Sequence, residues 1–170
     1  MAIESGQSNS ALTTRLQQAV NWGRKYSLWP IPYGTACCAI EFMASVSSYH
    51  DLSRYGAELV RFSPRQSDLM IVAGTISYKQ APILKTIYAQ MCEPKWVIAM
   101  GVCASSGGFY KNYGTLQGTD RVIPTDMYVA GCPPTPENLF HGLMKLQDKI
   151  DRDGIVSSED RHGARARVEG

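Results

Sequence analysis

The chain has 170 residues, of which 44% are hydrophobic and 19% are charged, and its formal net charge is only +2 at pH 7. This length and composition suffice for one domain with a full hydrophobic core, and the small net charge gives no reason to expect nucleic acid as a partner. No apolar run approaches the roughly 20 residues that a membrane-spanning helix needs, so the chain is not expected to cross a bilayer by itself.

The first 20 residues are predicted to form a polar N-terminal extension that leads into an amphipathic helix. Ser10 can cap this helix, and Leu12, Leu16 and Val20 recur on one of its faces. A basic helix of this kind can lie on a membrane or on a partner, or pack on its own domain. Because the N-terminus has no basic segment followed by an apolar run, it does not resemble a secretory signal, and we expect the five cysteines to lie in a reducing compartment.

The middle of the chain contains several short apolar segments. A short extended segment, interrupted by two prolines, is predicted at residues 28–33, and a helix is predicted at residues 36–46. Strands are predicted in four segments, at residues 58–62, 68–73, 96–100 and 127–130.

Amphipathic segments follow the later strands. One helix is predicted at residues 82–91, and another begins at Thr135 and Pro136 and continues to Ile150 with leucines at helical spacing. Apolar strands that alternate with amphipathic helices imply an α/β fold with a mainly parallel sheet covered on both faces. Residues 21–150 are therefore expected to form one α/β domain, and residues 151–170 a polar C-terminal tail.

Four of the five cysteines follow predicted extended segments or strands. Cys37 and Cys38 follow the segment 28–33, Cys103 follows the strand 96–100, and Cys132 follows the strand 127–130. Because the carboxyl ends of parallel strands share one edge of a sheet, we expect these thiols to converge there. Four thiolates at one point require a metal centre that offsets their charge.

Zinc and an iron–sulfur cluster are the usual choices for such a centre. Structural zinc usually takes local Cys-x-x-Cys pairs, which this chain lacks, and the Cys132–Pro133 pair is typical of some cluster motifs. These observations favour iron–sulfur, while zinc, a vicinal disulfide and coincidence remain alternatives. Cys92, next to Glu93 and Pro94, is interpreted as a small packed residue.

The segment 101–108 (GVCASSGG) is rich in glycine but matches neither a Walker nor a dinucleotide pattern. Phosphate binding is therefore not predicted there. We expect its small residues to let backbone amides approach cluster sulfur atoms, because such hydrogen bonds raise the reduction potential of a cluster.

Four segments in order resemble the cluster-bearing B subunit of respiratory complex I, the proton-pumping NADH:quinone oxidoreductase. They are YGTACCAIEFM at 33–43, RFSPRQSDLMIVAGT at 61–75, EPKWVIAMGVCASSGG at 93–108 and GCPP at 131–134. The chain is more distantly similar to the small subunit of nickel–iron hydrogenases. Those hydrogenases carry Cys-x-x-Cys where this chain has Cys37 next to Cys38, so the adjacent pair favours complex I.

The resemblance implies a flavodoxin-like fold without flavin and one 4Fe–4S cluster. The implied ligands of that cluster are Cys37, Cys38, Cys103 and Cys132. A ferredoxin-like two-cluster subunit would supply electrons, and quinone would be reduced in a cavity shared with a large hydrogenase-like subunit. A membrane-arm subunit at the quinone entry completes the expected partners. The implied location is the peripheral arm, on the cytoplasmic face of a bacterial inner membrane or the matrix side of a mitochondrial one.

The resemblance also assigns residues around the cluster and the cavity. Trp29 and Met43 match cavity positions, and Glu41, Asp51 and Asp68 match acidic positions near cluster and cavity. Trp29 and Met43 also have an ordinary interpretation as core residues, and Glu41 as a helix cap or an ion-pair partner.

Three arginines precede or border the strand 68–73, namely Arg54, Arg61 and Arg65. They would offset the negative charge of a thiolate-bound cluster. The alternative is that they form a basic surface that faces solvent or another subunit. No residue is assigned a catalytic role of its own, and no nucleotide-binding fingerprint is present, so we expect no NADH dehydrogenase activity from the chain alone. A hydrogenase small subunit, a zinc module and a flavin carrier are the competing hypotheses. The first would require further cysteines, and none follows Cys132.

Overall fold

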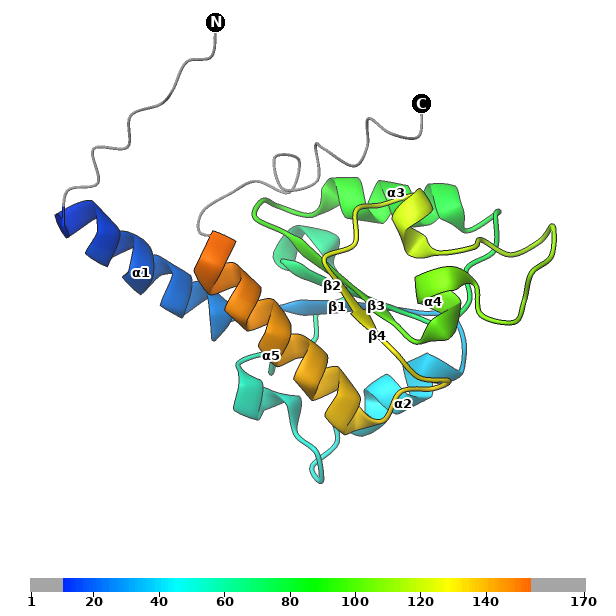
Figure 1. The fold of residues 1–170 in the computed structure, drawn as a ribbon, viewed down its shortest axis with the longest axis horizontal. Helices are drawn as coiled ribbons and strands as arrows, with labels where there is room; N and C mark the ends of the chain where they lie inside the picture. Colours follow the sequence, from blue (N-terminus) through cyan, green and yellow to red (C-terminus); the bar gives the residue numbers. More distant parts are fainter. Residues whose placement is uncertain (1–10, 154–170) are drawn as a thin grey trace, which may run out of the picture.

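The computed structural model describes residues 11–153, with side chains from Arg15 onward. Its centre is a four-stranded, all-parallel sheet in the order β1-β2-β3-β4 (Figure 1). The strands are β1 Pro30–Gly34, β2 Leu69–Ala73, β3 Trp96–Met100 and β4 Met127–Val129. The α/β prediction with a parallel sheet is therefore confirmed.

Five α-helices and three short 3-10 helices connect and cover the strands. The α-helices are α1 Ala11–Lys25, α2 Cys37–Ser45, α3 Ala81–Gln90, α4 Val102–Ser106 and α5 Pro136–Asp153. The 3-10 helices are η1 Leu52–Tyr55, η2 Pro64–Gln66 and η3 Thr119–Arg121. None of the described helices combines the length and the apolar character that a bilayer crossing needs.

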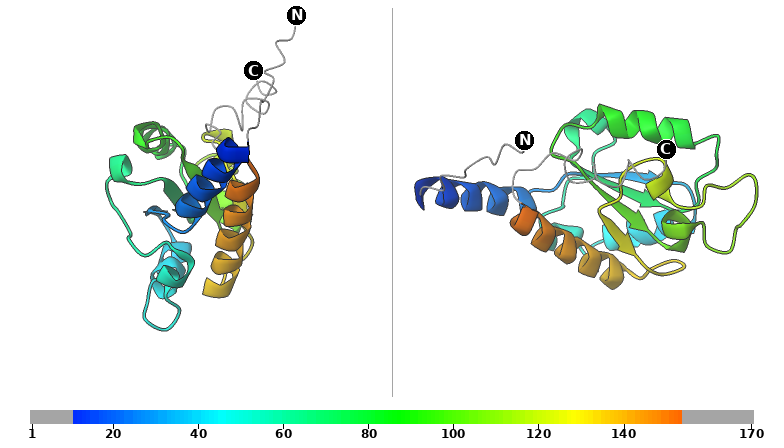
Figure 2. Two further views of the ribbon diagram at one scale, coloured as in Figure 1. Left: turned by 90° about the vertical axis from the view of Figure 1, so that its left-hand side faces the viewer. Right: turned by 45° about the horizontal axis from the view of Figure 1, so that its top comes forward.

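The two central strands are buried on both faces, which explains their continuous apolar sequences. Leu69 and Ile71 of β2 pack in one core with α2 and α5, whereas Met70 and Val72 pack in a second core with α3 and α4. This alternation follows from the two-residue period of a strand. The two cores place α2 and α5 on one face of the sheet and α3 and α4 on the other (Figure 2).

The predicted strand at residues 58–62 is wrong, and the extended segment with two prolines is instead the first strand of the sheet. Residues 58–62 run beside β1, but the bond from the Arg61 amide to the Pro30 carbonyl, at 2.9 Å, does not extend into a ladder. Pro30 and Pro32 have no N–H group, so the outer edge of β1 lacks the donors that a further strand requires. Leu59 and Phe62 are accordingly exposed.

The helix predictions agree with the structure apart from their ends. The C-terminal helix begins at Pro136 with Glu137 in its first turn, as predicted, and it runs three residues beyond the predicted end, to Asp153. Ion pairing of Lys25 with Asp151 joins this helix to α1. The predicted cap Ser10, the residues before it, and residues 154–170 of the predicted tail lie outside the described part of the chain.

Candidate functional site

Four cysteines lie at the carboxyl edge of the parallel sheet. Cys37 and Cys38 open α2 after β1, Cys103 is the second residue of α4 after β3, and Cys132 comes three residues after β4 ends. Cys38 and Cys103 are buried, whereas Cys37 and Cys132 are exposed. All five cysteines of the chain have free thiols, and the shared edge is the one that the sequence predicts.

The other three thiols influence the ionisation of Cys38. Its burial, then its contact with Cys37, and then the nearby thiols of Cys103 and Cys132 raise the pKa of Cys38 to about 12. This mutual influence requires the four thiols to be neighbours in space, although 95 positions separate Cys37 from Cys132 along the chain. The fold therefore brings together the four cysteines that the sequence singled out.

Two glycines lie beside these thiols. Gly101 has φ +89°, and a Cβ atom at this position would lie 2.5 Å from the Sγ atom of Cys38. Gly108 has φ +60°, and a Cβ atom there would lie 3.5 Å from the Sγ atom of Cys103. Both positions require the conformational freedom of glycine. Only Gly101 leaves space that a side chain would fill, beside the Cys38 thiol, because 3.5 Å is an ordinary contact distance at Cys103.

Backbone hydrogen bonds hold the cysteine-bearing loops against one another. The Gly101 amide donates to the Val129 carbonyl at 2.8 Å, and the Val102 amide donates to the Gly131 carbonyl at 2.9 Å. These bonds fix the loop of Cys103 to the loop of Cys132. Two amides of the segment 101–108 are thus already bonded to carbonyl oxygens. The expectation that the other amides of this segment approach cluster sulfur atoms stays a prediction.

The four thiols form a donor set that a 4Fe–4S cluster could use. Within the described residues, no three His, Cys, Asp or Glu side chains are arranged to hold one metal ion. A 4Fe–4S cluster makes a different demand, because each cysteine binds its own iron atom and the sulfur atoms stand around a larger body. Four neighbouring thiols, with the space that Gly101 leaves beside Cys38, are compatible with that demand.

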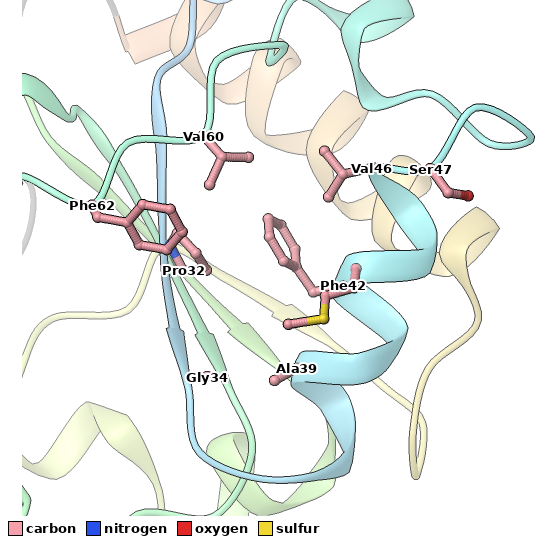
Figure 3. A pocket seen from close by; sticks show the side chains of 9 residues that line it. Pro32, Gly34, Ala39, Phe42, Val46, Ser47, Val60 and Phe62 are labelled. Atoms are coloured by element: carbon pink, nitrogen blue, oxygen red, sulfur yellow. The ribbon is translucent and has the colours of Figure 1, made fainter.

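An apolar cavity of about 460 Å³ opens along α2, the helix that begins with Cys37 and Cys38 (Figure 3). Its size is within the range of small-molecule sites. Its lining comes from β1, from α2 and the turn after it, and from the irregular segment after η1: Pro32, Gly34, Ala39, Phe42, Met43, Val46, Ser47, Val60 and Phe62. The cavity therefore follows the helix away from the cysteines.

The two residues predicted to line a cavity differ in position. Met43 lines this cavity and is 69% exposed. Trp29 is not among its lining residues. The Trp29 amide instead donates to Oδ1 of Asp68 at 2.7 Å, and the guanidinium carbon of Arg61 lies 4.7 Å from the centre of its ring.

Asp68 is the predicted acidic residue with the most altered environment. Burial raises the pKa of its carboxyl group to about 6, against the opposing effect of hydrogen bonds from the amides of Trp29, Asp68 and Leu69. The carboxyl group is thus half-buried beside the start of β1, where it fixes the backbone of Trp29.

The other predicted acids have local structural surroundings. Asp51 has φ +53° and caps η1 by accepting bonds from the Ser53 amide, at 3.1 Å, and from the Ser53 hydroxyl group. These bonds lower the pKa of Asp51, and the charge of Arg54 adds a smaller effect in the same direction. Glu41 is half-buried on α2, where its carbonyl oxygen accepts a bond from the Ser45 hydroxyl at 2.9 Å.

The remaining predicted residues lie toward the surface. Arg54 and Arg65 are exposed, and Arg61 is half-buried with an Nε atom that has no hydrogen-bond partner in the described part of the chain. Cys92 is exposed rather than packed, because it follows the end of α3 and its thiol donates only to the Arg65 carbonyl, at 3.6 Å.

Sequence reasoning missed most of the cavity lining. Phe42, Val46 and Phe62 were not singled out, although the segment 37–45 (CCAIEFMAS) is apolar on nearly all sides. A surface helix with one buried face would normally carry polar residues on the opposite face. This all-round apolar character was the available signal that α2 faces both the core and a second apolar surface.

Comparison with known proteins gives consistent results. The family model described as "NADH ubiquinone oxidoreductase, 20 Kd subunit" matches residues 36–146. The chain is 64% identical over 162 residues to the B subunit of NADH-quinone oxidoreductase from Campylobacter fetus subsp. fetus, covering 95% of each chain. It is 64% identical over 156 residues to the same-named protein of Aliarcobacter butzleri, covering 92% of this chain and 91% of the relative.

A solved structure is also similar. It belongs to the membrane-bound sulfane sulfur reductase, described as an archaeal respiratory membrane complex. The TM-score is 0.75 at 35% identity, and the alignment covers 79% of this chain and 76% of the other.

Proposed function

The chain belongs to the NADH ubiquinone oxidoreductase, 20 Kd subunit family, and from this membership we propose that it is the cluster-bearing subunit of a quinone-reducing respiratory complex. It holds one 4Fe–4S cluster and passes electrons one at a time to a quinone, a reaction that the whole complex couples to proton translocation. The proposed ligands are the four cysteines at the carboxyl edge of the sheet: Cys37, Cys38, Cys103 and Cys132.

The observation that carries this proposal is the mutual influence of the four thiols. Cys38 is buried, and the three other cysteines each raise its pKa. Metal ligation requires a thiolate, so Cys38 must release its proton when it binds iron. A cluster compensates the thiolate charges that would otherwise repel one another in this buried position.

The protein contributes position and surroundings. When bound, the cluster supplies single electrons to an acceptor, and its potential depends on hydrogen bonds, charge and solvent exposure. Burial of Cys38 and Cys103 shields two ligands from water, and Gly101 provides the space beside Cys38. The bonded loops after β3 and β4 fix the separation of their cysteines.

The apolar cavity along α2 is the proposed quinone site. Its residues begin with Ala39, which directly follows Cys38, so a ring in the cavity would be near the cluster. The lining suits an apolar ring and tail. Among the residues that line the cavity, Ser47 carries the one polar side chain, and its hydroxyl group already donates to the Ala44 carbonyl at 2.6 Å. We therefore expect the protons for quinone reduction to come largely from a partner subunit.

A partner surface is expected to complete this cavity. Met43 and Phe62, which line it, are 69% and 83% exposed, and Ile40 of the same helix α2 is 71% exposed. Exposed apolar side chains of this kind indicate an interaction surface. The proposed partner is a large hydrogenase-like subunit, with a ferredoxin-like two-cluster subunit as electron donor and a membrane-arm subunit at the quinone entry. A peripheral position at the membrane, on the cytoplasmic face in a bacterium, follows from this assembly.

Low-temperature electron spin resonance of the purified, reduced complex tests the proposal. Cys103→Ser should abolish one cluster signal and quinone reductase activity together, because it removes a buried ligand. Cys92→Ser is the matched control, since Cys92 is a cysteine away from the carboxyl edge, and it should leave both unchanged. If Cys103→Ser retains the signal and the activity, the ligand assignment is wrong.

A further inference from the structure

Residues 46–50, here called the cavity turn, follow α2 and contribute to the lining of the apolar cavity. Val46 and Ser47 at the start of the turn line the cavity (Figure 3). The amides of His50 and Asp51 donate to the Ser47 carbonyl, at 3.2 and 2.8 Å. Because these bonds join the end of the turn to its cavity-lining start, the position of His50 affects the shape of the cavity.

The side chain of His50 joins the cavity turn to α5. Residues 47–49 are exposed, whereas the His50 side chain is only 21% exposed. Its Nδ1 atom lies 3.7 Å from Oε1 of Glu137, in the first turn of α5. The His50 ring also lies near the ring of Phe140, further along α5, with the ring centres 6.2 Å apart.

The part of α5 that His50 contacts is itself firmly packed. Phe140 is buried and stacks on Tyr55 of η1, with the ring centres 4.9 Å apart. Leu139 and Leu143 of α5 pack in the core that covers β2 and β3. Because α5 is anchored in this way, the contacts of His50 with α5 restrain the cavity turn.

The charge of the pair formed by His50 and Glu137 depends on the histidine. The backbone amide of Glu137, then the Thr135 hydroxyl group, lower the pKa of the Glu137 carboxyl group, and His50 adds a smaller effect. Glu137 is therefore ionised at neutral pH, whereas histidine side chains change charge between about pH 5 and 8. Protonated His50 is attracted to Glu137, but at 3.7 Å the neutral ring is beyond hydrogen-bond distance.

Other charged groups near the cavity turn do not replace Glu137. The Asp51 carboxyl group accepts bonds from the Ser53 amide and hydroxyl group, and the charge of Arg54 also acts on it. Among the acidic residues that the structure describes, Glu137 is the one at ion-pair distance from His50. The elements around His50 carry three further titratable side chains, on the turn, on η1 and on α5: Tyr49, Tyr55 and His141.

We propose that His50 and Glu137 position the lining of the quinone cavity, so that the affinity for quinone falls as His50 loses its proton. The inference rests on the proposed function, because it concerns the cavity assigned to quinone there. Neither residue lines the cavity, so both are positioning residues that act through Val46 and Ser47. The pair is ionic at low pH and is lost as the pH rises through the range in which histidine ionises. Because the Glu137 side chain is 67% exposed, solvent screens the attraction, and we expect an effect of about two- to fivefold.

Steady-state kinetics of the complex purified with all its subunits test this inference, with a short-chain ubiquinone or menaquinone as acceptor. His50→Gln has no charge at any pH, so its KM for quinone should exceed that of the wild type about two- to fivefold at pH 6 and equal it at pH 8. His50→Arg keeps a positive charge, so its KM should equal that of the wild type at pH 6 and be about two- to fivefold lower at pH 8. Values of kcat should be unchanged in both variants. His141→Gln, at an exposed position on the same helix α5, is the matched control and should follow the wild type at both pH values.

A second variant removes the partner and keeps the histidine. Glu137→Gln should behave like His50→Gln, and combining the two substitutions should raise KM no further, because both remove the same interaction. This exposed position decides the question if His50→Gln does not assemble. Equal KM values at each pH in the wild type and in all the variants overturn the inference, and so does a fall in kcat without a change in KM.

Low-temperature electron spin resonance separates this inference from the proposed function. A wild-type complex without a cluster on this chain contradicts the proposed function. An intact cluster signal together with KM values that do not respond to His50 or Glu137 contradicts the positioning pair alone.

Discussion

Gly101→Ala is expected to damage both the fold and the cluster site. Gly101 precedes α4 with φ +89° and ψ 165°, a conformation that side-chain-bearing residues rarely adopt. Its added Cβ atom would lie 2.5 Å from Sγ of Cys38 and 3.5 Å from the Gly131 carbonyl oxygen. Backbone strain of about 1–3 kcal/mol and overpacking of about 1–3 kcal/mol together predict a loss of roughly 2–6 kcal/mol in the free energy of unfolding.

Chemical denaturation of the full chain measures this loss, and iron content per chain measures the effect on the site. Because the displaced atom is a proposed ligand, iron content should fall with stability. Gly23→Ala is the matched control, since Gly23 lies in α1 with nothing within 4 Å of the added atom, and it should stabilise by about 0.5–1 kcal/mol. If Gly101→Ala unfolds within about 0.5 kcal/mol of the wild type and keeps its iron, the close packing of glycine on the Cys38 thiol is refuted.

Three further predictions follow from ionisable and cavity residues. Because the pKa of Asp68 rises from 3.8 to about 6 on folding, this carboxyl favours the fold when protonated, and its contribution, at most about 3 kcal/mol, is lost as pH rises through about 6. Asp68→Asn should remove this contribution to the pH dependence of the free energy of unfolding, measured by denaturation from pH 4 to 7. If the variant and the wild type have the same pH dependence, the raised pKa of Asp68 is rejected. Lys149→Ala breaks a 2.8 Å ion pair with Asp126, whose side chain is 2% exposed. Because a buried carboxylate loses its cation, the free energy of unfolding should fall by about 3 kcal/mol, and a fall of less than about 1 kcal/mol would contradict this prediction. Met43→Ala should raise KM for quinone about tenfold, equivalent to about 1.4 kcal/mol, whereas Met144→Ala, a 40% exposed methionine on α5, should leave KM unchanged.

The sequence predicted the sheet best where strands are buried on both faces. Residues 69–73 and 96–100 are continuous apolar runs because helices cover both of their sides. The edge strand β1 was predicted only as an extended segment, because prolines usually argue against a strand. Pro30 and Pro32 are tolerated because their missing N–H groups face away from β2, and that arrangement depends on the register of the sheet, which a single sequence does not specify.

The cysteine site was predictable and the cavity largely was not. Parallel strands bring their following loops to one edge, so Cys103 and Cys132 could be placed together from the order of elements alone. The lining of the cavity depends on how Val60 and Phe62 cross the outer edge of β1. The same residues were predicted as a strand, and only tertiary packing decides between a strand and a cavity wall.

Metal and sulfide analysis of the chain, purified without oxygen from its complex, tests the central claim most directly. Cys37, Cys38, Cys103 and Cys132 are proposed to bind one 4Fe–4S cluster, so the chain should be brown and contain about four irons and about four inorganic sulfides. One zinc per chain with no iron and no sulfide would contradict the account, because the gathered thiols would then serve a structural ion.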